Sequence, residues 1–188
     1  MSFQYKQSEI DKIYYKDIPV ARIVRAGETI WDEFVKLEDK TQMSKIYPNT
    51  YDKLEVIDKK FDGKDMTDAT GMFKDCKALT ALPVMKNMDN VTSFKDFAQA
   101  CTSLKDVAEL PTKQAKDLSG MFAYCTSLPE VFPWTIHLDS AESSLSIKDM
   151  FTGSSVKEAT FECGVTKNVS YQDLKDNCGC QIVHYIEA

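Results

Sequence analysis

The chain of 188 residues is 43% hydrophobic and 11% aromatic, which is enough for the core of one ordinary domain and argues against global disorder. Acidic residues number 29 against 23 lysines and arginines, so the formal net charge is -6. A balance of this sign offers no long basic patch for phosphate backbones, and nucleic acid is not an expected partner.

Residues 1–10 lack the basic start and the apolar stretch of a secretory signal, and no later run is apolar enough to span a bilayer. We therefore expect no membrane insertion and no export. A chain from which a signal had been removed would have the same sequence, so a bacterial surface location stays open.

Residues 1–35 predict a small β module. From Ile13 to Trp31 apolar and polar residues alternate, with turn signals at 17–19 and 26–28, which is typical of short strands joined by tight turns. Such a module can cap the open face of a repeat domain or dock the protein onto a larger assembly, and the sequence supports both roles. The residues expected to dock are Tyr14, Val20, Ile23 and Trp31.

The residue order of this module resembles a short phrase of phage tail and other virion proteins. The shared positions are Tyr14, Asp17, Val20, Gly27 and Trp31. The chain departs from the phrase at Lys16, where glycine is usual, and at Arg25, where an aromatic residue is usual. The resemblance implies that the module docks within a virion.

Two elements are expected between the module and the repeats. Residues 31–37 predict a short helix, which a charged connector with a turn signal at 47–50 follows. The apolar run Leu54–Ile57 lies one repeat ahead of Leu79 and predicts the first strand of a sheet.

The stretch from Met66 to Phe161 repeats itself. The motif Met-Phe-x-x-Cys-x-x-Leu begins at Met72, and its cysteine recurs at intervals of 25 and 24 residues, while a fourth copy has Ser154 in the cysteine column. A period of this length is typical of leucine-rich repeats. The residues expected to form the core are Met72, Phe73, Cys76, Leu79, Phe97, Cys101, Leu104, Met121, Phe122, Cys125, Leu128, Met150 and Phe151.

Each repeat predicts one helix and one strand. Polar runs such as residues 67–71 precede the Met-Phe pairs and can cap a short helix, and Leu79–Leu82 and its equivalents predict short parallel strands. The predicted fold class is an α/β repeat, in which residues 36–165 form a leucine-rich-repeat solenoid with short parallel strands and short helices. The β module precedes the solenoid, and residues 166–188 form a C-terminal cap.

The Met-Phe-x-x-Cys-x-x-Leu repeat, with its Asp-Leu-Ser-Gly lead-in at 117–120, resembles the BspA-like leucine-rich repeats of bacterial surface proteins, lipoproteins and some phage proteins. The resemblance covers about half of the chain. It implies a repeat scaffold used for binding, and it brings no catalytic residue to carry over.

An insertion separates the third and fourth copies, whose Met-Phe pairs stand 29 residues apart, and the additional residues fall around 133–140. Insertions in repeat proteins emerge as loops, often on the binding face. Trp134 in this insertion can anchor a partner or a sugar, or it can pack over the edge of the core.

The cysteines fall into two groups. Cys76, Cys101 and Cys125 occupy one repeat column and predict a ladder of buried free thiols rather than disulfides. The second group is a ligand-like cluster of Cys163, Cys178, Cys180 and His184. Its Cys-x-Cys spacing is poor for zinc, so no metal is expected, and the sequence leaves open whether these cysteines are free, paired as Cys163 with Cys178, or metal-bound.

The C-terminal cap is expected to contain a short helix at 169–174 and a closing strand at 179–186. No nucleophile motif accompanies His137 or His184, and no phosphate-binding glycine-rich loop occurs. We therefore expect neither an enzyme nor a cofactor.

The expected function is that of a non-enzymatic phage virion structural or accessory protein, associated with the tail, a fibre or the capsid and made in the host cytoplasm. Its repeat domain would bind other virion proteins or a receptor or glycan on the host surface, in an assembly that can be oligomeric. The alternative is a bacterial cell-surface adhesin or interaction protein.

Overall fold

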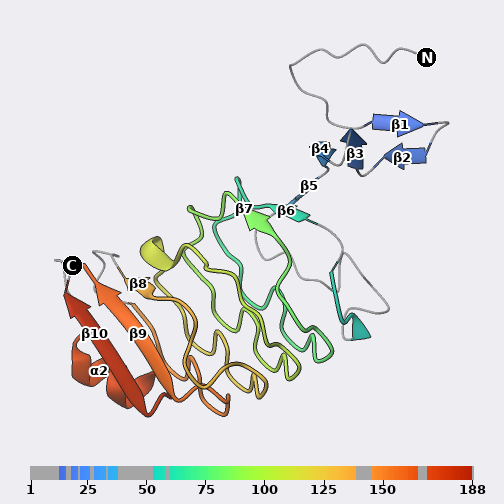
Figure 1. Ribbon diagram of the computed structural model, residues 1–188. Coiled ribbons are helices and arrows are strands. Elements are labelled where there is room, and N and C mark those ends of the chain that lie inside the picture. The colour runs from blue at the N-terminus through green and yellow to red at the C-terminus, as the bar shows by residue number, and fades with distance from the viewer. Residues whose placement is uncertain are drawn as a thin grey trace.

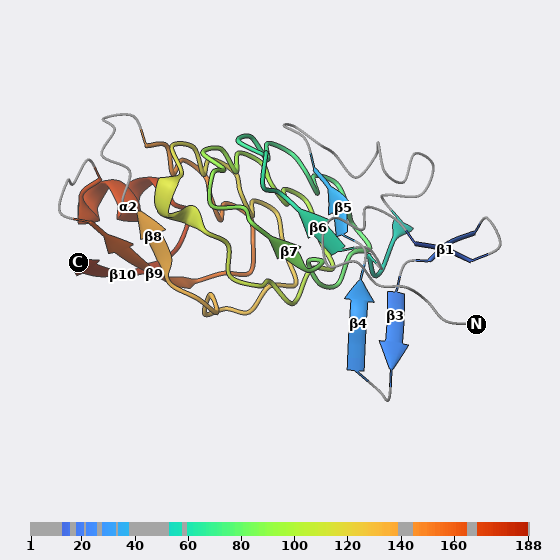
Figure 2. The same ribbon diagram turned by 90° about the horizontal axis from the view of Figure 1, so that it is seen from above.

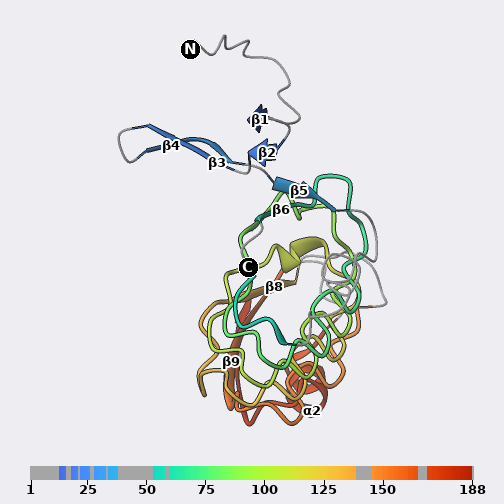
Figure 3. The ribbon, with the colours of Figure 1, turned by 90° about the vertical axis from the view of Figure 1, so that its right-hand side faces the viewer.

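The computed structural model describes residues 13–15, 18–20, 22–25, 28–32, 34–37, 53–57, 60–138, 145–164 and 169–187, with side chains described from residue 37 onward. In this part of the chain, short strands lie at both ends of a stack of coils (Figure 1). Figure 3 views the stack nearly end-on and shows successive coils superimposed around a shared interior.

Two antiparallel hairpins form the described part of the N-terminal segment. β1 (Ile13–Tyr15) pairs with β2 (Ile18–Val20), and β3 (Arg22–Arg25) pairs with β4 (Glu28–Asp32). These strands confirm the strand prediction for this segment. The β3–β4 hairpin projects away from the stack of coils (Figure 2).

A parallel sheet of β5 (Phe34–Lys36), β6 (Lys60–Asp62) and β7 (Met85–Lys86) lies at the N-terminal end of the stack. The helix predicted for residues 31–37 is wrong, because the end of β4 and all of β5 occupy this segment. Pairing with β6 satisfies the backbone groups that a helix would have bonded internally.

The first repeat strand does not form where the sequence predicts it. Leu54–Ile57 is a bend and coil, linked to the next coil by the Thr80 N–H, which donates to the Glu55 carbonyl (3.0 Å). β6 begins only at Lys60, further along the chain.

Backbone hydrogen bonds hold successive coils together. The Phe73 N–H donates to the Phe97 carbonyl (2.7 Å), and the Ala98 N–H donates to the Met121 carbonyl (2.9 Å). The Phe122 N–H continues the series with a bond of 2.9 Å to the Met150 carbonyl. Each bond joins the second residue of a Met-Phe pair, or of the equivalent Phe97-Ala98, to the first residue of the next pair, so the spacing of the pairs is the number of residues in one coil.

The predicted fold class, an α/β leucine-rich-repeat solenoid with a short helix in every repeat, is wrong. The described residues include one α-helix, α2 (Tyr171–Asn177), and one 3-10 turn, η2 (Thr112–Gln114), and neither contains a Met-Phe pair. The Met-Phe segments are turns, in which short local bonds such as Cys76 N–H to the Phe73 carbonyl (3.1 Å) alternate with bonds to the next coil.

Left-handed backbone at two positions of each repeat explains why these segments do not form helices. The residues that precede the Met-Phe pairs or their equivalent have φ values of 64, 52, 63 and 58°, at Gly71, Asp96, Gly120 and Asp149. The residues that precede the cysteine column have φ values of 63, 61, 62 and 70°, at Asp75, Ala100, Tyr124 and Gly153. Since a right-handed helix requires negative φ throughout, two positive values four residues apart interrupt it.

Parallel strand pairing is also weaker in the middle of the stack than the sequence predicts. The segment Leu79–Leu82 contributes one isolated bridge, Ala81 with Asp106, instead of a strand. Pairing resumes at the C-terminal end, where β8 (Ile136–Leu138), β9 (Glu158–Cys163) and β10 (Ile182–Glu187) form a second parallel sheet in the order β10-β9-β8.

The interior of the coils is apolar. All thirteen residues that the sequence places in the core are buried there. Phenylalanine rings from neighbouring coils are in contact, as Phe73 is with Phe97, at a centroid distance of 5.1 Å. Burying a side chain of this size contributes about 1.5–3 kcal/mol, so this interior is a major source of stability.

The cysteine column consists of buried free thiols, in agreement with the ladder predicted from the sequence. The Cys101 thiol donates to the Phe73 carbonyl (3.0 Å), and the Cys125 thiol donates to the Ala98 carbonyl (3.0 Å). Burial raises the pKa of Cys125 to about 12. The contact with the Cys76 thiol, together with burial, raises the pKa of Cys101 well above its ordinary value.

The C-terminal segment bonds to the last repeat. Ser170 and Asp173 form a capping box at the start of α2, in which each side chain accepts the other residue's backbone N–H. At the other end of α2, the Cys178 carbonyl accepts the Phe151 N–H (2.8 Å). In the preceding coil the equivalent N–H, that of Phe122, bonds to Met150 of the next repeat, so Cys178 takes the place of a further repeat. The helix and strand predicted for this segment are confirmed, with ends shifted by a few residues.

Candidate functional site

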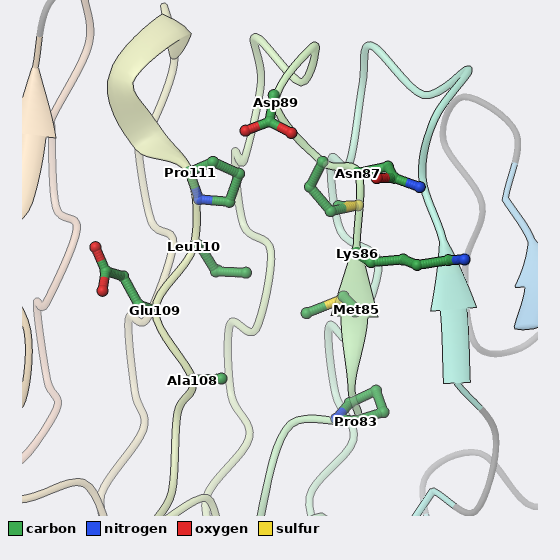
Figure 4. Close-up of a pocket in the computed structure, with 10 residues that line it drawn as sticks. Pro83, Met85, Lys86, Asn87, Asp89, Ala108, Glu109, Leu110 and Pro111 are labelled. Carbon is green, nitrogen blue, oxygen red and sulfur yellow. The ribbon is translucent and has the colours of Figure 1, made fainter. Parts of the chain in front are cut away.

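A groove of about 320 Å³ lies between β7 and the corresponding segment of the next coil. This volume lies at the lower end of the range of about 300–1,000 Å³ that is typical of ligand pockets. Its lining residues are Pro83, Met85, Lys86, Asn87, Met88, Asp89, Ala108, Glu109, Leu110 and Pro111. Figure 4 shows β7 on one wall and the segment from Ala108 to Pro111 on the other.

The groove exists because the parallel pairing of strands stops at β7. On the β6 side, the Val84 and Lys86 carbonyls accept the N–H groups of Phe61 (3.0 Å) and Gly63 (3.0 Å). Bonding residues alternate along a parallel strand, so the N–H and C=O of Met85 point away from β6 and toward the groove. Among the described residues, no strand pairs with this edge of β7.

The opposite wall is held in place by a side chain rather than by strand pairing. Thr112 is fully buried, its hydroxyl donates to the His137 carbonyl (2.9 Å), and the same oxygen accepts the His137 N–H (3.1 Å). The Thr112 hydroxyl thus makes the two hydrogen bonds to the edge of β8 that the backbone of a neighbouring strand would otherwise make. Pro111, which has no N–H to donate, lies just before it.

The centre of the groove is apolar and one end is acidic. Figure 4 shows Met85, Leu110 and Pro111 directed toward the space between the walls, with Asp89 at one end. The carboxylate of Glu109 is directed away from the groove, and one of its oxygens lies 3.8 Å from Nε2 of His137.

Lys86 does not add an uncompensated positive charge to this end of the molecule. Its ammonium group lies 3.3 Å from the Asp62 carboxylate, which also accepts hydrogen bonds from the Asn87 amide (2.9 Å) and the Lys64 N–H (3.1 Å). Burial works to raise the pKa of Asp62, but these hydrogen bonds and the lysine charge outweigh it, so the pKa lies below its ordinary value. Asp62 is therefore ionised and balances Lys86.

The four residues expected to dock lie in the two hairpins, in β1, β2, β3 and β4 respectively. Ile23 and Trp31 are cross-strand partners, whereas Tyr14 and Val20 lie opposite Pro19 and Ile13. Their side chains fall outside the described part of the structure.

Trp134 lies at the edge of the core, which is one of the two positions that the sequence left open. Its ring packs on Phe132 at a centroid distance of 4.8 Å, and it is partly buried against the core. Its buried Nε1–H has no hydrogen-bond acceptor among the described residues.

The structure separates the members of the ligand-like cluster. Cys163 is buried at the end of β9, where its ladder partner is Glu187, and His184 on β10 lies 2.8 Å from a carboxylate oxygen of Glu158. Cys178 and Cys180 lie close to each other. In the described part of the chain, no group of three or more His, Cys, Asp or Glu residues is arranged to hold a metal ion.

None of the described helical segments has the length and apolar character needed to cross a bilayer.

The sequence did not predict the groove. A signal was available in the two prolines at its walls, Pro83 and Pro111, because proline cannot donate to a strand ladder. A proline in the sequence, however, does not distinguish strand pairing that continues through the neighbouring residues from pairing that is interrupted and leaves a groove.

These features define a repeat protein made of hydrogen-bonded coils, with a groove where strand pairing is interrupted. The chain belongs to the family described as "Mycoplasma protein of unknown function, DUF285", whose model matches residues 40–162. This family is related to the BspA-like repeats. Searches of curated proteins and of solved structures gave no match.

Proposed function

We propose that this protein is a non-enzymatic binding module whose groove accepts an extended segment of a partner polypeptide. The observation that carries the proposal is the exposed edge of β7, where the N–H and C=O of Met85 point into the groove. An extended peptide can add to such an edge through main-chain hydrogen bonds, and pockets for its alternate side chains then provide specificity.

The lining of the groove favours one kind of segment. Met85, Leu110 and Pro111 form an apolar centre that suits an aliphatic side chain. Asp89 at one end, on a chain with a net charge of -6, favours a lysine or arginine beside that aliphatic residue. The expected ligand is therefore an extended segment in which an aliphatic residue and a basic residue stand two positions apart, on the same face of the strand.

A backbone substitution tests this mode of binding. The Met85→Pro substitution removes the N–H that faces the groove and leaves the bonds of Val84 and Lys86 to β6 in place, while Met85→Ala removes the same side chain but keeps the N–H. The probe is a short fluorescent peptide in which a valine and a lysine stand two positions apart, with binding followed by anisotropy. Loss of one hydrogen bond of about 1 kcal/mol should weaken binding by Met85→Pro about fivefold relative to Met85→Ala.

Two further measurements complete the test. Asp89→Lys should weaken binding of the lysine peptide and strengthen binding of a matching glutamate peptide. Circular dichroism establishes that each variant is folded. Equal affinity of folded Met85→Pro and Met85→Ala for the peptide would exclude strand addition at this edge.

The setting in which the module works is a second part of the proposal. The N-terminal phrase at Tyr14, Asp17 and Trp31 supports a virion structural or accessory protein whose hairpins dock onto another virion protein. The family description names Mycoplasma, a bacterium, and supports the alternative of a bacterial cell-surface interaction protein. In both settings the Met-Phe-x-x-Cys-x-x-Leu motif is the building unit of a BspA-like binding scaffold.

Mass spectrometry of purified phage particles and of bacterial envelope fractions separates these settings. Peptides of this chain at a fixed stoichiometry in particles would support the virion assignment. Peptides found in the envelope fraction and absent from particles would refute it and favour the surface protein.

A further inference from the structure

Cys178 and Cys180 form a pair that neither the repeat architecture nor the groove uses. Cys178 ends α2 and is fully buried, whereas Cys180, just beyond it, is partly exposed. The Cys180 N–H donates to the Cys178 sulfur at 3.4 Å. The two thiols are near enough for the Cys180 thiol to stabilise the Cys178 thiolate.

Gly179 permits this close arrangement. Its φ of +87° is a conformation that other residues adopt rarely, and a Cβ atom at this position would lie 2.6 Å from the Thr152 nitrogen. The chain therefore turns tightly against the last repeat. Cα atoms two residues apart are at most about 7 Å from each other, and a turn brings them into the range of about 4.4–6.8 Å that a disulfide requires.

We propose that Cys178 and Cys180 are a redox-active dithiol, which a low-molecular-weight disulfide such as glutathione disulfide converts to an intramolecular disulfide. This site is independent of the binding function of the groove.

The exposures of the two residues assign the order of the reaction. The sulfur of the partly exposed Cys180 attacks one sulfur of glutathione disulfide, and its proton passes to the neighbouring Cys178 sulfur. One glutathione thiolate leaves, and Cys180 is then joined to glutathione by a mixed disulfide. The buried Cys178 loses its proton and attacks the Cys180 sulfur, which releases the second glutathione. Two protein thiols are thereby oxidised and one disulfide is reduced to two thiols.

The environment of Cys178 favours the first step, in which Cys178 accepts the proton of the Cys180 thiol. The Cys180 thiol, and with it the backbone N–H, stabilises the Cys178 thiolate and lowers the pKa of Cys178 to about 7, although burial opposes this shift. After Cys180 has formed the mixed disulfide, its thiol no longer stabilises the Cys178 thiolate, and the backbone N–H of Cys180 remains as the donor to the Cys178 sulfur in the second step. Thiolate is the nucleophile in disulfide exchange, so Cys178 is suited to resolve the mixed disulfide.

The closed disulfide would also alter the end of the stack. The Cys178 carbonyl accepts the Phe151 N–H, and Gly179 lies against Thr152. A change of backbone at Cys178 therefore acts directly on the last repeat.

The tryptic map makes the test direct. No lysine or arginine follows Lys175, so trypsin releases residues 176–188 as one peptide whose only cysteines are Cys178 and Cys180. The folded, full-length protein is incubated in glutathione redox buffers, quenched with acid, alkylated and digested. The expected product is a 176–188 peptide that has lost two hydrogen atoms and carries no alkyl group, and dithiothreitol should reverse the change.

Single substitutions distinguish the two roles. In Cys178→Ser, Cys180 should keep one glutathione as a stable mixed disulfide, because the resolving thiol is missing. In Cys180→Ser, the buried Cys178 should remain unmodified over the same time. The peptide with buried Cys163, residues 158–167, serves as an internal control and should be fully alkylated as a free thiol.

Two results would overturn the proposal. One is a 176–188 peptide that carries two alkyl groups in the most oxidising buffer. The other is a wild-type protein that accumulates the same stable glutathione adduct as Cys178→Ser. Circular dichroism before the quench ensures that the reaction is that of the folded protein.

Discussion

Replacing Thr112 by valine removes the hydroxyl that bonds the groove wall to β8 and keeps the size and shape of the side chain. The hydroxyl has two bonds to the backbone of His137, one as donor and one as acceptor. Leaving a buried backbone group without a partner costs about 1–3 kcal/mol, so two such groups set an upper bound of about 6 kcal/mol.

The expected cost is smaller than this bound. His137 is only partly buried, so the loss of its two bonds is not the loss of bonds between fully buried groups. We therefore expect Thr112→Val to lower the free energy of unfolding by about 2–3 kcal/mol. The matched variant Thr112→Ser keeps the hydroxyl and loses one methyl group, which should cost about 1 kcal/mol.

Urea denaturation followed by circular dichroism measures both values. The valine variant should also bind the peptide probe more weakly, because the wall that carries Leu110 and Pro111 is no longer fixed to β8. A valine variant as stable as the serine variant would refute the view that the Thr112 hydroxyl takes the place of a neighbouring strand.

Further predictions concern the turns, the thiols and the C-terminal cap. Ala100→Gly should stabilise the protein by about 0.5–1 kcal/mol, because Ala100 has a φ of 61°, which glycine adopts more readily. Gly120→Ala should destabilise the protein, because the new Cβ would lie 2.4 Å from a carboxylate oxygen of Asp96. The urea midpoints of the two variants test both predictions. Burial raises the pKa of Cys125 from 9.0 to about 12, so as the pH rises this thiol ionises in the unfolded chain before it ionises in the folded one. The free energy of unfolding should therefore fall between pH 9.0 and about 12, by at most about 1.4 kcal/mol per pH unit. The Cys125→Ala variant should show a shallower decline in an alkaline urea series, and an unchanged slope would contradict this cause. Ser170→Ala should cost about 1 kcal/mol at neutral pH by thermal or urea unfolding. Hydrogen bonds from Ser170 lower the pKa of Asp173, so the contribution of the capping box is present above the ordinary carboxyl pKa of 3.8 and is lost as the pH falls through the lowered value.

The periodic pattern was a reliable guide to what is buried. A residue that recurs once per coil meets its counterparts in the neighbouring coils, so Phe73, Phe97 and Cys101 could be assigned to one interior from spacing alone. The capped α2 and the strand β10 were also recognisable, because their signals are local.

The same pattern misled the prediction of local structure within each repeat. Polar runs before a Met-Phe pair satisfy the rules for a helix cap, and nothing in them excludes a helix. The deciding factor is the bonding of alternate N–H groups, such as that of Phe73, to a carbonyl in the next coil. These bonds compete with the internal bonds of a helix and are absent from any one repeat taken alone.

The sequence by itself determined the period of the repeats, the identity of the buried column and the presence of a C-terminal helix and strand, because these depend on spacing and local signals along the chain. The tertiary structure decided three other features: the turns in place of helices, the interruption of strand pairing at β7 and the contact of the Cys180 N–H with the Cys178 sulfur. The turns and the groove depend on whether backbone groups in different coils bond to one another, and the cysteine contact depends on how Gly179 packs against Thr152. Such bonds and contacts form only when the coils are stacked.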